Sequence, residues 1–154
     1  MEGIELLRLE HRQLLDVFDE LEFTTGTLER TRLLGQLAEL LKAHAALEEE
    51  VFYPAIRVTG IPGAAEIVDE ALAAHRAADL VLDETLGAEA SVANVKVLRD
   101  VVEAHFDDEE QRLLPLVEQL GDTTRAALAT RIERRADELH EDDDDDSAAA
   151  YAKP

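Results

Sequence analysis

Four long amphipathic segments, separated by short breaks, constrain the fold of this 154-residue chain more than any other feature. Each segment places an apolar residue every three or four positions, which is the spacing of one face of a helix. The breaks are marked by glycine or proline and lie near residues 26, 60–63 and 87. Long helices that are joined by such short loops lie antiparallel. The sequence therefore predicts an all-α, up-down-up-down four-helix bundle.

A short fifth helix is expected at the C-terminal end, over about residues 124–139, after a further break at Gly121. From Glu141 the chain continues as an acidic run and then as small residues. Like charges in such a run repel one another, and none of these residues can join an apolar core. We therefore expect a helical domain over residues 1–140 and an acidic disordered tail over residues 141–154.

The composition argues against several classes of protein. The chain has no cysteine, which rules out disulfides, thiolate zinc sites and cysteine nucleophiles. Its 15 basic and 36 acidic residues give a net charge of −21, which argues against nucleic acid or an anionic membrane as a partner. No apolar run approaches the roughly 18 residues of a membrane span, and the acidic N-terminus does not resemble a secretory signal. We expect a cytoplasmic monomer.

One histidine interrupts each of the four apolar stripes. At about 1.5 Å of rise per residue, counting outward from the loops places neighbouring histidines within about 4 to 6 Å of the same depth. All four rings should therefore meet in one layer of the bundle interior. These residues are His11, His44, His75 and His105.

Two of the histidines are followed by a glutamate four residues later, in the pairs His44/Glu48 and His105/Glu109. Residues at positions i and i+4 lie one above the other on a helix face, so each pair can address one point in the core. Each pair also leads to a proline, ten positions after its histidine. The two hairpins are thus an internal duplication, and two similar halves that face each other suit two metal ions.

A single histidine on an apolar face is more commonly a hydrogen-bonded core residue than a metal ligand. Four buried imidazoles and two buried carboxylates in one layer, however, would be very costly without a partner. Zinc needs only about four ligands, and calcium and magnesium prefer oxygen alone. The set suits iron or manganese, and the Glu-x-x-His of carboxylate-rich di-iron bundles is absent at all four histidines. These residues favour a histidine-rich di-iron centre.

The order His, His-x-x-x-Glu, His, His-x-x-x-Glu, over about residues 4–118, resembles the hemerythrin-like (HHE cation-binding) domain family. The resemblance implies a four-helix bundle that holds two iron ions in an oxo- or hydroxo-bridged centre. It also implies that the histidines are terminal ligands and that the glutamates bridge the ions. The implied metal ligands are His11, His44, Glu48, His75, His105 and Glu109.

Two further residues are candidates for a place beside the metal. Tyr53 lies five residues after Glu48, where an ideal helix would point it away, but Pro54 distorts that turn, so an indirect role and a direct ligand role both stay open. Asp79 follows His75 by one turn, where oxygen-carrying hemerythrins have another histidine. It either faces the iron or turns to solvent, with Ala78 in the inner row. An anionic ligand would favour ferric iron and oppose reversible oxygen binding.

Two classes of function therefore stay open, with a purely structural metal as a third. The first is a di-iron oxidoreductase that reacts with peroxide, dioxygen or nitric oxide in a catalase- or peroxidase-like manner. The second is an oxygen- or iron-binding protein, a sensor or carrier, without turnover. No further domain that could report a signal is recognisable, which favours the first class, with a peroxide or diatomic molecule as its ligand.

Overall fold

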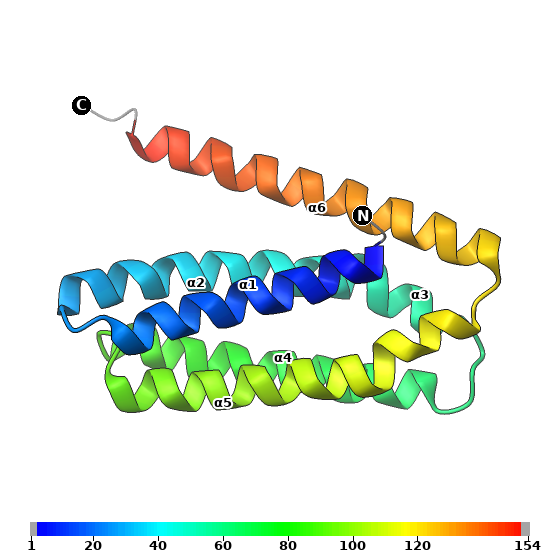
Figure 1. Cartoon of the computed structure of the whole chain (residues 1–154), viewed down its shortest axis with the longest axis horizontal. Helices are drawn as coiled ribbons and strands as arrows, with labels where there is room; N and C mark the ends of the chain where they lie inside the picture. The colour runs from blue at the N-terminus through cyan, green and yellow to red at the C-terminus, as the bar shows by residue number, and fades with distance from the viewer. Residues whose placement is uncertain (1–2, 152–154) are drawn as a thin grey trace.

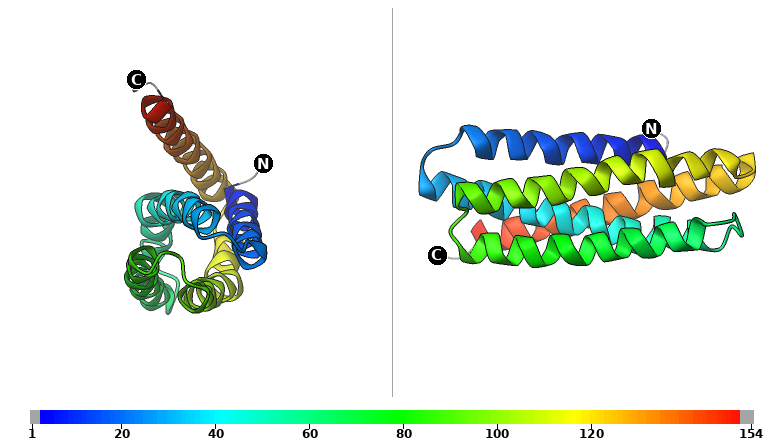
Figure 2. Two further views of the ribbon diagram at one scale, coloured as in Figure 1. Left: turned by 90° about the vertical axis from the view of Figure 1, so that its left-hand side faces the viewer. Right: turned by 90° about the horizontal axis from the view of Figure 1, so that it is seen from below.

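The computed structural model describes the backbone of residues 3–151 and the side chains of residues 3–141. Four long helices lie at the corners of a bundle, so that each one packs against two neighbours in the order α1, α2, α4, α5 and back to α1 (Figures 1 and 2). The predicted all-α four-helix bundle is confirmed. The four helices are α1 (Gly3–Phe23), α2 (Thr27–Leu47), α4 (Ala64–Gly87) and α5 (Val92–Asp108).

Two of these helices continue into distorted segments that begin at the predicted glutamates. After α2 comes the π-helix η1 (Glu48–Phe52) and then α3 (Tyr53–Arg57). After α5 comes the π-helix η2 (Glu109–Leu113) and then the 3-10 helix η3 (Leu114–Gln119). The prolines at positions 54 and 115 lack the N–H that an α-helix would use, so the α-pattern cannot run through them. A π-helix adds a residue to the turn and thereby rotates the side chains that follow.

The apolar core consists of two clusters with the histidine layer between them. One cluster surrounds Leu7, Leu47 and Phe52 at the end of the bundle where the π-helices lie. The other surrounds Leu14, Phe18 and others at the opposite end. The histidines thus interrupt an otherwise continuous apolar interior. Among the described residues, no helix combines the length and the apolar character needed to cross a membrane.

The helix α6 (Asp122–Tyr151) is the predicted fifth helix, and it is longer than the expected 124–139. Leu128, Ile132 and Ala136 pack it against the bundle, and its later turns lean away from the other helices (Figures 1 and 2). A helix that packing has nucleated propagates at little further cost, which explains the additional turns. The side chains from residue 142 onward lie outside the described residues, so the disorder expected for 141–154 stays a prediction.

The contact between α1 and α6 can be tested at Gly3. A Cβ on this residue would lie 2.8 Å from the Ala129 Cα and 3.2 Å from Ile132 side-chain atoms, so Gly3→Ala must push the helices apart. We expect a loss of about 1–3 kcal/mol in the free energy of unfolding, measured with urea. Gly35→Ala is the matched control, because its new methyl group would meet no neighbouring atom within 4 Å and the change should stabilise α2 by about 0.5–1 kcal/mol. Equal stability of Gly3→Ala and the parent protein would contradict this packing.

Candidate metal centre

The structure brings the six predicted residues together in two overlapping clusters. In each cluster, four possible ligand atoms all lie within 4.8 Å of one another. Cluster A contains His11 and His44, cluster B contains His75 and His105, and both contain Glu48 and Glu109. Both glutamates are fully buried or nearly so, at 0% and 1% exposure. The arrangement is two sites that share two carboxylates.

The imidazoles present their Nε2 atoms to these carboxylates. Glu48 Oε1 lies 3.1 Å from His44 Nε2 and 3.3 Å from His75 Nε2. Glu109 places Oε1 at 3.2 Å from His11 Nε2 and Oε2 at 3.4 Å from His105 Nε2. Each carboxylate therefore faces one histidine from each cluster. Such an arrangement allows a carboxylate to bridge two cations.

Several of these atoms have no hydrogen-bond partner among the described residues, although they are buried. They include both carboxylate oxygens of Glu48, Oε1 of Glu109, and Nε2 of His11 and His44. Burying such groups without compensation costs several kcal/mol, and a carboxylate costs the most. Bound cations would satisfy all of them at once. Four imidazole nitrogens with two carboxylates suit a metal such as iron or manganese.

The proton affinities of these groups reflect their crowding. Burial, together with the charge of Glu48, raises the pKa of Glu109 to about 7. Burial also opposes ionisation of Glu48, but the neighbouring His44 outweighs it and holds the pKa of Glu48 well below its usual value. Burial lowers the pKa of His44, yet Glu48 and Glu10 outweigh this effect and raise it well above 6.5. In the metal-free protein, protons are therefore bound to some of the atoms that a metal would contact, and a metal must displace them in order to bind.

Carboxylates also contact three of the histidines at Nδ1, the ring nitrogen on the side away from the shared glutamates, which is called the outer nitrogen below. His44 Nδ1 donates to Glu10 Oε2 at 2.7 Å, and His11 Nδ1 donates to Glu110 Oε1 at 3.1 Å. Glu49 Oε2 lies 3.5 Å from the third outer nitrogen, that of His75. Sequence reasoning missed Glu10, because only the packing of α1 against α2 brings it to His44. Outer carboxylates of this kind orient a histidine toward a metal and increase its basicity.

The phenol of Tyr53 lies inside the site, close to cluster B. Its hydroxyl donates to Glu109 Oε2 at 2.6 Å and lies 3.1 Å from His75 Nε2 and 3.4 Å from His105 Nε2. The π-helix η1 ends immediately before Tyr53, and its additional residue turns this side chain inward, where an ideal α-helix would turn it outward. Burial and the two nearby glutamates raise the pKa of Tyr53 far above its usual value, so the phenol keeps its proton.

Asp79 lies on the solvent side of α4, while Ala78 is half-buried. Asp79 nevertheless lines a small cavity of about 30 Å³, together with His44, His75 and His105. The cavity is therefore a narrow space beside the clusters. Of the two orientations considered for Asp79, the structure has the exposed one.

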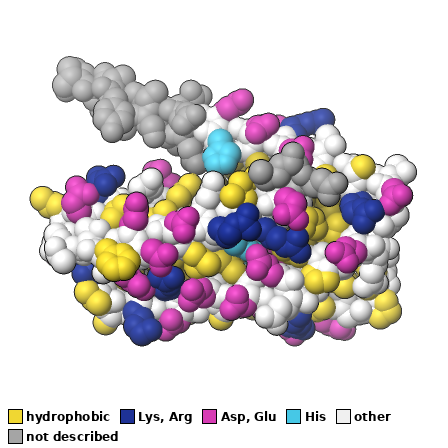
Figure 3. Space-filling model, viewed as in Figure 1, with side chains coloured by type: hydrophobic (Ala, Val, Ile, Leu, Met, Phe, Trp, Pro, Cys, Tyr) yellow, Lys and Arg dark blue, Asp and Glu magenta, His cyan; other side chains and the backbone are white. Residues whose placement is uncertain are grey.

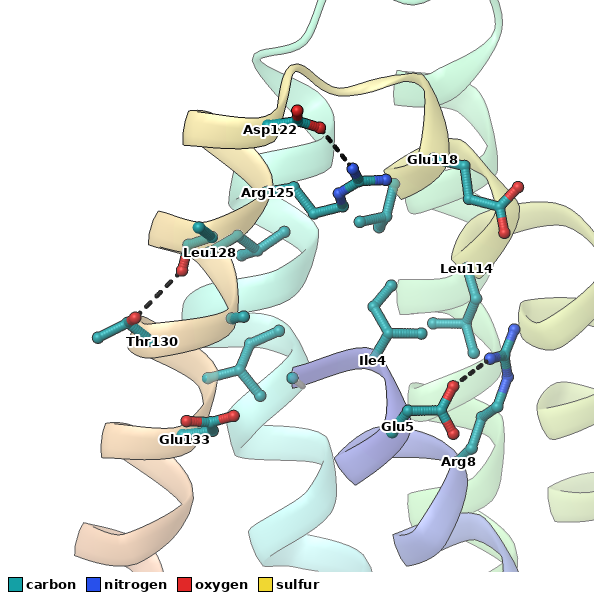
Figure 4. Close-up of a pocket in the computed structure, with 15 residues that line it drawn as sticks. Ile4, Glu5, Arg8, Leu114, Glu118, Asp122, Arg125, Leu128, Thr130 and Glu133 are labelled. Atoms are coloured by element: carbon teal, nitrogen blue, oxygen red, sulfur yellow. Dashed lines mark hydrogen bonds and ion pairs between the residues drawn. The ribbon is translucent and has the colours of Figure 1, made fainter. Parts of the chain in front are cut away.

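A further cavity is separate from the two clusters. It has a volume of about 580 Å³ and lies between the start of α1, η3 and the first turns of α6 (Figure 4). Two ion pairs lie within its lining, Arg8 with Glu5 and Arg125 with Asp122. None of the six cluster residues belongs to its lining as the structure describes it.

Comparison with known proteins agrees with this geometry. Residues 2–117 match the Hemerythrin HHE cation binding domain, so the chain belongs to that family. It is also 28% identical over 114 residues to a protein named DNA nickase from Nostoc sp. (strain PCC 7120 / SAG 25.82 / UTEX 2576). This match covers 73% of the chain but 32% of the relative, so the chain spans about a third of that relative's length. No solved structure matches the chain significantly. The predicted family is confirmed, and the family together with the two clusters suggests a metal site here.

Metal binding to these clusters should depend on pH, because protons compete with the cation. With a pKa of about 7, Glu109 alone should weaken binding about tenfold between about pH 8 and about pH 6. The raised pKa of His44 adds to this effect in the same direction. Titration of the metal-free protein with Co²⁺ at several pH values measures the affinity. A constant affinity over this range would contradict the protonated state of the metal-free site.

Proposed function

We propose that this protein binds two iron ions, one at each cluster, and reacts with small oxidants such as peroxide, dioxygen or nitric oxide. The sharing of both buried glutamates by two pairs of histidines carries this proposal. Two separate mononuclear sites would not need common carboxylates. The proposed ligands are the four histidines at 11, 44, 75 and 105, with Glu48 and Glu109 as bridges.

Iron bound at these positions would supply the electrons that reduce such an oxidant. The chain's own groups control protons and water around it. Tyr53 keeps its proton and donates a hydrogen bond from inside the site. Phe106 stacks on the His11 ring at a centroid distance of 4.0 Å and closes the site on that side. Tyr53 thus supplies a hydrogen-bond donor inside the site, and Phe106 supplies an apolar wall beside it.

The space beside the clusters limits the size of the molecule that can react. The adjoining cavity measures about 30 Å³, and since one water molecule needs roughly 10–15 Å³ of such space, it accommodates about two groups of that size. A diatomic molecule or a peroxide fits such a space, whereas an organic substrate does not. This volume supports a catalase- or peroxidase-like reaction over oxidation of a large substrate.

Cleavage of DNA, which the name of the Nostoc relative describes, is not part of this proposal. About two thirds of that relative lies outside the match. The net charge of −21 opposes binding to a polyanion. On the face in Figure 3, acidic side chains are spread along the length of the bundle. A binding measurement with duplex DNA at low salt checks this expectation.

Iron content tests the proposed ligands. We expect two irons per chain after anaerobic loading with Fe²⁺, and one or none in Glu48→Ala and Glu109→Ala, because each glutamate serves both clusters. His140→Ala is the control, since this histidine lies within α6 and outside both clusters. Metal analysis after gel filtration measures the content. Two irons in both glutamate variants would show that they do not bridge the ions.

The reaction with oxygen distinguishes an oxidoreductase from a carrier. Anaerobically reduced protein is mixed with oxygen or peroxide, and the absorption spectrum is followed over time. We expect rapid conversion to the ferric state, with consumption of added peroxide over repeated turnovers. Reversible uptake of oxygen, released again under vacuum, would overturn the oxidoreductase and support a carrier.

A further inference from the structure

Clusters A and B differ in the groups that contact the outer nitrogens of their histidines. In cluster A, both outer nitrogens donate to carboxylates, His44 to Glu10 at 2.7 Å and His11 to Glu110 at 3.1 Å. In cluster B, the outer nitrogen of His75 is buried without a hydrogen bond, with Glu49 at 3.5 Å. His105 makes all its described polar contacts through Nε2, so its outer nitrogen has no partner among the described residues.

The difference can be traced to one position in the duplicated sequence. Glu10 directly precedes His11 on α1 and reaches His44 on α2, the next helix of the same hairpin. The corresponding residue of the second hairpin is Ala74, which directly precedes His75 on α4 and cannot reach His105 on α5 with a carboxylate. Glu49 and Glu110, in contrast, are present in both halves. The second half therefore has no carboxylate in place of Glu10, and its Glu49 contact of 3.5 Å is longer than the 3.1 Å hydrogen bond of Glu110.

The Glu10 contact is also well protected from water. The Glu10 side chain is 14% exposed, whereas Glu49 is 46% exposed and Glu110 is 38% exposed. A charge-assisted hydrogen bond is stronger where solvent does not screen it. Glu10 therefore holds His44 in one tautomer, with Nε2 free to bind a metal, more firmly than any other outer group holds its histidine.

The two clusters also differ in how many of their histidines line the small cavity. Cluster B contributes both of its histidines, His75 and His105, whereas cluster A contributes only His44. Tyr53 OH also approaches the Nε2 atoms of cluster B. The Phe106 ring stacks on His11 of cluster A at a centroid distance of 4.0 Å and lies 6.0 Å from His105 of cluster B.

We propose that the two metal positions are unequal, with Glu10 as the positioning residue that makes cluster A the tight position and Ala74 leaving cluster B as the exchangeable one. This inference rests on the proposed binding of two ions. Cluster A would fill first and retain its metal. Cluster B would bind its metal more weakly and would release it first.

The test measures metal retention in the full chain, without reference to any activity. Protein loaded anaerobically with Fe²⁺ is mixed with a ferrous chelator, and the release of metal is followed over time. We expect two kinetic phases of one equivalent each in the parent protein. Glu10→Gln should speed the slow phase by about 10–100-fold, which is the usual effect of losing such a carboxylate behind a histidine ligand. Glu39→Gln, at an exposed position on α2, is the charge-matched control.

A gain-of-function variant makes the test independent of damage to the protein. Ala74→Glu restores the missing carboxylate beside His105 and should slow the fast phase, while Ala73→Glu, one residue earlier on α4, should not. Release of both equivalents at one rate in the parent protein, or acceleration of only the fast phase by Glu10→Gln, would overturn the inference. Binding of a single equivalent would refute the two-ion function instead. In that case, faster loss of the single equivalent from Glu10→Gln than from the parent protein would support the role of Glu10, and equal retention would contradict it.

Discussion

Two carboxylates buried in the middle of an apolar bundle are the constraint on which the rest of this structure depends. Glu48 and Glu109 lie between two apolar clusters, and three of their four oxygens have no hydrogen-bond donor among the described residues. Such charges are stable only beside positive charge, which protonated histidines supply in the metal-free protein and metal ions supply in the loaded one. Stability and metal binding are therefore linked through the same six side chains.

The backbone accommodates this layer by departing from the α-helix at two corresponding places. Both π-helices begin at a glutamate that the two clusters share, and both run up to a proline-containing turn. Beyond them the halves diverge, because Tyr53 follows the first π-helix and Leu114 follows the second. The duplication thus preserves the residues of the two clusters while the groups around them differ. A pair of equal metal positions would not be expected from such unequal surroundings.

Membership in the hemerythrin family defines the scaffold and the presence of a metal site, but a scaffold does not select a reaction. That selection depends on the space, the proton donors and the charge near the metal. Here the space is small, Tyr53 donates a hydrogen bond inside the site, and Asp79 lies at the solvent side of the cavity. These local features, rather than the fold, support a reaction with small oxidants.

The sequence by itself determined the bundle, the histidine layer and the six cluster residues. These features follow from helical periodicity and from residues four positions apart on one helix, which are local properties of the chain. Only the tertiary structure decided the inward direction of Tyr53, the exposure of Asp79, the contact of Glu10 with His44 and the length of α6. A π-helix rotates the following side chains away from the directions that the ideal α-helical repeat predicts. A contact between two helices depends in turn on how the helices pack. The six cluster residues could be predicted from spacing along the chain, whereas the groups that contact them come from other helices or from a distorted turn and required the packed bundle.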